Sequence, residues 1–179
     1  TPVAPPAAPA DPDRGLRAAV LAAPHDDAAR SALVQHWLGT GDPRGELAEI
    51  ELALARRLAI PTRKALRARR DQLHATHAKR WWPWPVEHRT RGGFVHAVIT
   101  DNVEWWLGHA NEVLAQEPVL ELALDDVDED SLSQVARAAW LSRIESLRLR
   151  GPIGDDGFAV LCKSKQLTRL RRLNVSCNE

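Results

Sequence analysis

A short motif of apolar residues recurs three times near the C-terminus, and it restricts the possible folds more than any other feature of the sequence. Each copy reads L-x-x-L-x-L, with Leu, Ile or Val at the apolar positions, over residues 119–124, 144–149 and 170–175. The central positions are leucines separated by 25 and 26 residues: Leu122, Leu147 and Leu173. This spacing is typical of leucine-rich repeats, in which each unit adds a short strand and a helix to a curved stack.

The segments between the copies are compatible with helices, as this architecture requires. The last copy continues to Asn178, which completes the longer pattern L-x-x-L-x-L-x-x-N, and the chain stops directly afterwards. Because the chain also starts with Thr rather than Met, we expect a fragment whose repeats are truncated at the C-terminus. A solenoid end without a cap exposes apolar surface, so the uncapped last repeat is a candidate surface for self-association.

Two helical patterns meet at a sharp corner near residue 41. The corner combines a glycine, which tolerates positive φ, with an Asp-Pro pair, which favours the start of a helix. Farther on, Thr62 is a candidate N-cap for a helix that runs from residue 63 to about residue 79. We interpret the corner as structural, with a polar site at Asp42, Arg44 and Glu46 as the alternative. It consists of Trp37, Gly41, Asp42, Pro43, Arg44, Gly45 and Glu46.

These patterns divide the chain into three parts. Residues 1–12 are a Pro/Ala-rich linker, expected to be disordered, residues 13–90 form a small helical domain, and residues 91–179 form the repeat region. We expect strands near residues 94–99, 120–124, 146–149 and 172–175. The predicted fold class is α+β passing into an α/β solenoid, in which the helical domain caps a curved leucine-rich-repeat stack with a short parallel sheet.

The order of the motifs resembles a bacterial family of repeat-companion proteins, in which a small helical domain precedes leucine-rich repeats. Four stretches carry the resemblance: Trp37-Leu38, Gly41-Asp42-Pro43-Arg44-Gly45-Glu46, Arg91-Gly92-Gly93-Phe94-Val95 and Pro118-Val119-Leu120-Glu121-Leu122. It covers residues 13–179, although the family usually has an acid just before the Trp, where this chain has His36. The repeats resemble the ribonuclease-inhibitor type, mainly at residues 153–157. The resemblance implies a fold and no particular biochemical activity.

Charge is balanced over the whole chain but not along it. Lys and Arg together number 24, as do Asp and Glu, whereas residues 56–91 hold eleven Lys and Arg against two acids. The basic helix 63–80 and the adjacent Trp81, Trp82 and Trp84 could bind single-stranded nucleic acid through phosphate contacts and base stacking. The alternative interpretation is that the tryptophans seal the helical domain onto the first strand and that the basic helix is solvated.

No motif for catalysis, a cofactor or a metal is recognisable. The chain lacks a G-x-S-x-G segment, a phosphate-binding glycine loop and a Cys-His pair with a local signature. His74 and His77 share a helix face but have no third ligand nearby. We therefore predict a non-enzymatic protein without catalytic residues, cofactor or metal. Two cysteines, no apolar run of bilayer length and no secretory leader favour a cytoplasmic location without membrane attachment.

Strand alternation predicts where a partner would bind. The apolar residues of each copy point inward, so the residues between and beside them face the concave side of the stack. The predicted binding residues are Glu121, Ala123, Asp125, Ser146, Arg148, Arg150, Arg172, Asn174 and Ser176. A polar row with several arginines fits another protein that exposes carboxylates. We therefore predict a protein–protein interaction scaffold, with nucleic-acid binding as the alternative function. These charges could also simply pair across the strands.

Overall fold

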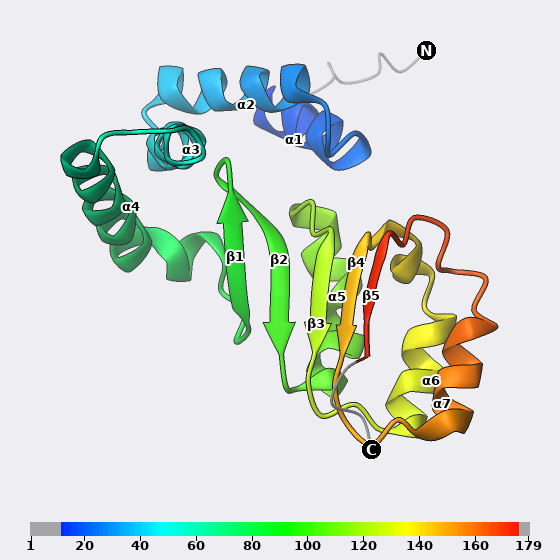
Figure 1. The fold of residues 1–179 in the computed structure, drawn as a ribbon. Helices are drawn as coiled ribbons and strands as arrows, with labels where there is room; N and C mark the ends of the chain where they lie inside the picture. Colours follow the sequence, from blue (N-terminus) through cyan, green and yellow to red (C-terminus); the bar gives the residue numbers. More distant parts are fainter. Residues whose placement is uncertain (1–11, 176–179) are drawn as a thin grey trace, which may run out of the picture.

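The computed structural model describes residues 12–175. Over this range the chain has an α+β fold with seven α-helices, one short 3-10 helix and a five-stranded mixed sheet (Figure 1). Pro12 is the first residue of the first helix, and the rest of the predicted linker lies outside the described range. Within residues 12–175, none of the helices has both the length and the apolar character needed to cross a bilayer.

The N-terminal half consists of four helices: α1 (Pro12–Ala22), α2 (Asp27–Thr40), α3 (Pro43–Leu54) and α4 (Ile60–Trp81). Gly41 ends α2 with a φ of 73°. The Asp42 side chain then accepts a hydrogen bond from the backbone N–H of Arg44 at 2.9 Å, and α3 starts with Pro43. These residues turn the chain sharply between α2 and α3. The prediction that Thr62 caps α4 is wrong, because α4 begins at Ile60 and has no side-chain cap.

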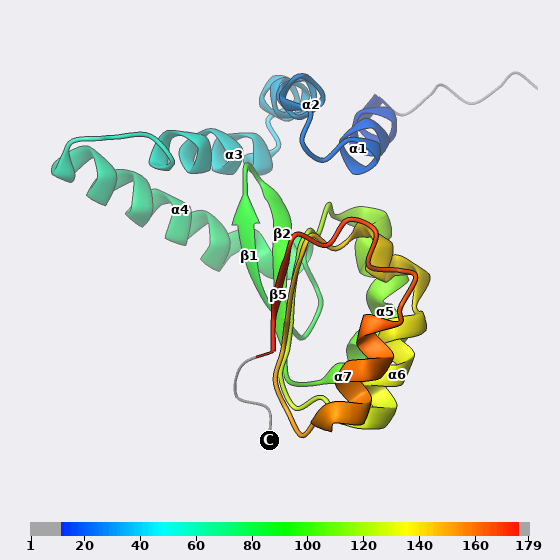
Figure 2. The same ribbon diagram turned by 45° about the vertical axis from the view of Figure 1, so that its right-hand side comes forward.

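The sheet has the strand order β1 (Glu87–Arg91), β2 (Phe94–Thr100), β3 (Glu121–Leu124), β4 (Ser146–Leu149) and β5 (Arg172–Asn174). β1 and β2 are an antiparallel hairpin, and β2 to β5 are parallel. Parallel neighbours require crossover connections. These contain α5 (Val103–Gln116), α6 (Glu129–Arg137), a 3-10 helix (Ala139–Arg143) and α7 (Gly154–Cys162), and the three α-helices cover one face of the sheet (Figure 2).

The repeated leucines lie on the helix-facing side of the sheet. The parallel register places Leu147 beside both Leu122 and Leu173, and it places Leu124 beside Leu149. The leucines of β3 and β4 are at most 2% exposed and belong to the main hydrophobic cluster. The motif therefore identifies correctly which residues of β3 and β4 are buried, because alternate residues of a strand point to opposite faces.

The predicted solenoid is wrong. The three copies contribute strands of four, four and three residues, and these strands join an antiparallel hairpin in one mixed sheet rather than a curved stack. A solenoid needs successive units that bury one another's apolar face, whereas Leu173 of the third copy is 39% exposed. Asn178, which was predicted to complete that copy, lies outside the described residues.

Three tryptophans join the helical half of the protein to the sheet. Trp81, Trp82 and Trp84 are buried in the same hydrophobic cluster as the sheet leucines. A second, smaller cluster packs Trp37 of α2 against Phe94 of β2, with ring centroids 5.1 Å apart. The predicted domain boundary between residues 90 and 91 falls within β1.

Candidate functional site: the open face of the sheet

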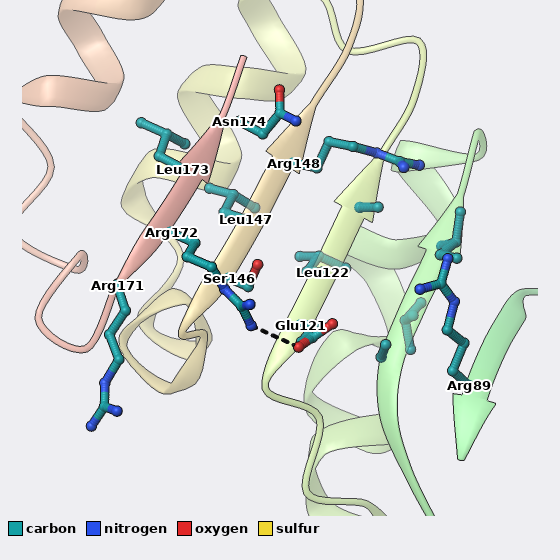
Figure 3. A pocket seen from close by; sticks show the side chains of 14 residues that line it. Arg89, Glu121, Leu122, Ser146, Leu147, Arg148, Arg171, Arg172, Leu173 and Asn174 are labelled. Carbon is teal, nitrogen blue, oxygen red and sulfur yellow. Dashed lines mark hydrogen bonds and ion pairs between the residues drawn. The ribbon is translucent and has the colours of Figure 1, made fainter. Parts of the chain in front are cut away.

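The side of the sheet opposite α5–α7, which we call the open face, carries a pocket of about 560 Å³ (Figure 3). Side chains alternate along a strand, so the residues between the buried leucines project onto this side. Ala97 of β2 and Ala123 of β3 contribute only small side chains to the lining, which leaves room between the longer ones. The polar lining is Arg89, Glu121, Ser146, Arg148, Arg171, Arg172 and Asn174.

Two ion pairs connect neighbouring segments on this face. Arg172 Nη2 lies 2.9 Å from Glu121 Oε1, which bridges β5 to β3 across β4 (Figure 3). Arg148 Nη2 lies 3.4 Å from Asp125 Oδ2. Arg148 Nε and Asp125 Oδ1 are buried and have no hydrogen-bond partner. The second pair is therefore only partly satisfied by contacts within the described residues.

The pocket lining is positively charged. It contains four arginines and one carboxylate: Arg89, Arg148, Arg171, Arg172 and Glu121. Arg171 is held only loosely, with its Nε 3.9 Å from Glu145 Oε2, and 74% of its side chain is exposed. Arg89 has no ion pair within residues 12–175. The open face therefore presents exposed guanidinium groups over a base that includes Ala97, Ile99 and Ala123.

The structure brings most of the predicted binding residues together. Arg148 lies between Ala123 and Asn174 in the register of β3, β4 and β5, as alignment of the motif copies requires. Arg150 is exposed but does not line the pocket, and Ser176 lies outside the described residues. The predicted residues that line the pocket are Glu121, Ala123, Ser146, Arg148, Arg172 and Asn174.

Sequence reasoning missed Arg89 and Arg171. Arg89 lies in β1, opposite Ala97 of β2, next to a register shift between Arg89 and Thr90. The polar sequence of β1, Glu-His-Arg-Thr-Arg, has no apolar alternation that would have identified a strand. Arg171 immediately precedes β5, so extending the third motif copy by one residue would have found it.

The corner residues make contacts that hold helices together. Both carboxylate oxygens of Glu46 accept hydrogen bonds from the guanidinium of Arg69 on α4, at 2.6 and 2.7 Å. The Trp37 indole N–H donates to Asp13 Oδ1 on α1 at 2.9 Å. Gly45 lies so close to Leu38 that a Cβ there would be 2.8 Å from the Leu38 backbone nitrogen. These contacts stabilise the packing of α1, α2, α3 and α4.

Of the two interpretations of the tryptophans, burial favours the seal between the helical half and the sheet over a stacking platform for nucleic-acid bases. Trp81, Trp82 and Trp84 are 7%, 3% and 8% exposed, so their ring faces are not available to stack on a ligand. The three tryptophans are buried because they pack with residues of the sheet in the main hydrophobic cluster, which also contains Leu73 of α4. The tryptophans instead seal α4 onto the sheet.

Within residues 12–175, no group of three or more His, Cys, Asp or Glu side chains is placed to hold a metal ion. Comparisons of the chain with family models, with curated proteins and with solved structures found no match. The resemblance to repeat-companion proteins therefore stays a prediction from the motifs.

Proposed function

We propose that this protein is a non-enzymatic binding module that holds an acidic segment of another protein on the open face of its sheet. The observation that carries the proposal is the excess of arginine over carboxylate in the pocket lining. Arginine binds carboxylates through two parallel hydrogen bonds, which gives direction as well as attraction. The aspartate and glutamate side chains of a partner would therefore find several arginines within one pocket.

The ion pairs already present on the open face are easily exchanged. The side chains of Arg172 and Glu121 are 72% and 37% exposed, and exposed pairs of this kind contribute only about 0.2–1 kcal/mol. A carboxylate from a partner can therefore replace Glu121 at little cost. The Arg148 Nε group, which is buried without a partner, offers a further donor once the side chain reorients.

The spacing of the arginines suggests the length of the bound segment. They extend from β1 to β5, and neighbouring strands lie about 4.8 Å apart, so the arginines span roughly 19 Å. An extended peptide rises about 3.3 Å per residue, so a segment of about six residues covers this distance. The proposed ligand is an extended segment with several Asp or Glu residues.

The test uses a fluorescent eight-residue peptide of alternating Glu and Ser, with a Gln-for-Glu peptide of the same length as the uncharged comparison. Binding is followed by fluorescence anisotropy. The variant Arg148→Glu/Arg172→Glu reverses two charges of the pocket. The control Arg67→Glu/Arg137→Glu makes the same change in net charge at exposed arginines outside the lining. We expect the pocket variant to weaken binding of the Glu peptide about tenfold or more.

Equal weakening by both double variants would show that the peptide responds only to net charge, and the proposal would then be wrong. Equal binding of the Glu and Gln peptides would also contradict it.

We assign the protein to the cytoplasm, where its exposed Cys162 would stay reduced.

A further inference from the structure

A second pocket, of about 550 Å³, lies among the N-terminal helices and the end of α5. Its lining shares no residue with the pocket on the open face. Its charged groups come from α1, α3, α4 and the residue after α5, so no single stretch of sequence reveals it. The charged lining is Asp13, Arg14, Arg17, Arg44, Arg80 and Glu117.

The two carboxylates do not neutralise the four arginines. Asp13 Oδ2 is taken by Arg17 Nε at 2.6 Å, and Asp13 Oδ1 accepts the indole N–H of Trp37. Arg14 and Arg80 are exposed at the rim, and neither has an ion pair within the described part of the chain. Two guanidinium groups of the lining are therefore available to a ligand.

Arg44 is the deep cation of this pocket, and its hydrogen bonding is incomplete. The residue is 8% exposed, and its guanidinium carbon lies 5.5 Å from the centre of the Trp81 ring. Arg44 Nη2 donates to the Trp81 carbonyl at 3.3 Å, whereas Arg44 Nε is buried and has no acceptor. Burial lowers the pKa of this guanidinium from its ordinary value, and the nearby positive charge of Arg17 lowers it further.

Glu117 is a poor counter-ion for Arg44. Its Oε1 lies 4.0 Å from Arg44 Nη1 and accepts the indole N–H of Trp82 at 3.1 Å, while its Oε2 accepts the backbone N–H of Val95 at 2.8 Å. Both oxygens are therefore engaged in holding the start of β2 and Trp82. A buried cation with a distant, shared carboxylate still attracts an additional anion.

The rest of the lining is largely apolar. It brings an indole ring and small aliphatic groups next to the arginines, namely Ala18, Leu21, Trp81, Pro83 and Ala115. Such a mixture of an apolar wall and a few converging charged groups is typical of sites for small organic ligands. An inorganic ion would use only the charged part of the pocket.

We propose that this pocket binds a small organic anion, whose phosphate or carboxylate group is held by Arg14, Arg44 and Arg80 while its apolar part packs against Leu21 and Pro83. This function is separate from peptide binding on the open face, because the two sites share no residue. The four elements that form the pocket would be held together by the bound ligand.

The test measures binding of three probes by isothermal titration calorimetry at constant ionic strength, set with sodium chloride. Phenyl phosphate carries both a dianion and an apolar group, benzoate replaces the phosphate by a carboxylate, and inorganic phosphate lacks the apolar group. We expect phenyl phosphate or benzoate to bind with saturation and at least threefold more tightly than inorganic phosphate. The order of these two aromatic probes identifies which oxyanion the pocket prefers.

The variants are Arg14→Gln and Arg80→Gln, both at exposed positions. Each is expected to weaken binding of the preferred probe about tenfold, since each removes a hydrogen bond to a charged group. Arg67→Gln, at an exposed arginine of α4 outside the pocket, is the matched control and should bind as the unaltered protein does. Absence of saturable binding by every probe, or equal weakening by Arg67→Gln, would overturn the proposal.

Discussion

Glu51 of α3 accepts a hydrogen bond from the backbone N–H of Gly93, in the turn between β1 and β2, at 2.8 Å. The other oxygen of the same carboxylate accepts a hydrogen bond from the Thr90 hydroxyl. The Glu51 side chain is 8% exposed, so these bonds are shielded from water. These two hydrogen bonds hold the β1–β2 hairpin against the helical half of the protein, so substitutions in the turn at Gly93 should be destabilising.

Replacement of Gly93 by Ala is expected to destabilise the protein by about 2–4 kcal/mol. Gly93 has a φ of 79°, which costs an L-residue about 1–2 kcal/mol. An added Cβ would also lie 3.1 Å from Ala48 Cβ and 3.2 Å from the Arg44 carbonyl oxygen. Urea denaturation measures the change. Gly92→Ala is the matched control, since Gly92 also has positive φ but no atom within 3.4 Å of an added Cβ, and it should cost less.

The central leucines of the first and third copies of the repeated motif are expected to differ in their contribution to stability. Leu122→Ala should cost about 2–5 kcal/mol, because Leu122 is 2% exposed in the main cluster. Leu173→Ala should cost less, about 1–2 kcal/mol, since Leu173 is 39% exposed and the change removes less buried surface. Measuring the free energy of unfolding of each variant by urea denaturation compares the two costs. Equal costs would mean that the third copy packs as the first does, contrary to the structure.

Asp42→Ala is expected to destabilise the protein by about 1 kcal/mol. The change removes the side-chain acceptor for the Arg44 N–H at the start of α3. Thr62→Ala is the comparison, because Thr62 lies inside α4 and provides no cap, so its loss should change stability by less than about 0.5 kcal/mol. Thermal unfolding of both variants gives the two values. A larger effect at Thr62 would show that α4 begins later than Ile60.

Stability is expected to fall with acidification because of two histidines near the hairpin. Burial lowers the pKa of His88 and of His96 below the ordinary value of 6.5. Between that value and the lowered pKa, the unfolded chain binds more protons than the folded one, so the stability contributed above pH 6.5 is lost as the pH falls. Glu117 has the opposite effect, because burial raises its pKa above 4.5 and favours the folded state at low pH.

The variant His88→Phe/His96→Gln separates the effect of the histidines on stability from that of Glu117. His88 packs edge-on against Trp82, with ring centroids 5.1 Å apart, so Phe preserves an aromatic ring there. The difference in unfolding free energy between the unaltered protein and the variant should decrease from pH 7 to pH 5, measured by urea denaturation at each pH. A constant difference would mean that neither histidine titrates differently in the folded and unfolded states.

Local chemistry made parts of this fold predictable. Gly41, Asp42 and Pro43 act through backbone preferences and one short-range hydrogen bond, so their turn could be inferred without knowledge of the remaining chain. The repeated leucines likewise predicted the parallel register and the buried side of β3 and β4, because alternation along a strand is a local property.

Local sequence could not exclude the solenoid. The motif determines which side of a strand is buried, but it does not determine which other strands pair with that strand's edges. β1 forms because β2 offers it an edge and Gly92-Gly93 allows the turn, although its own sequence is polar. The arginine pocket among the helices was equally hidden, since Arg14, Arg44 and Arg80 are brought together only by tertiary packing.

The main hydrophobic cluster continues from α3 and α4 through the three tryptophans into the sheet. Neither half can therefore lose its structure without uncovering apolar surface of the other, and exposure of apolar surface raises the heat capacity. Calorimetry of residues 12–175 should accordingly give one transition whose van't Hoff and calorimetric enthalpies agree. The smallest cooperative folding unit of this chain thus includes both the helices and the sheet, and dissecting it at residue 90 would cut β1 in two.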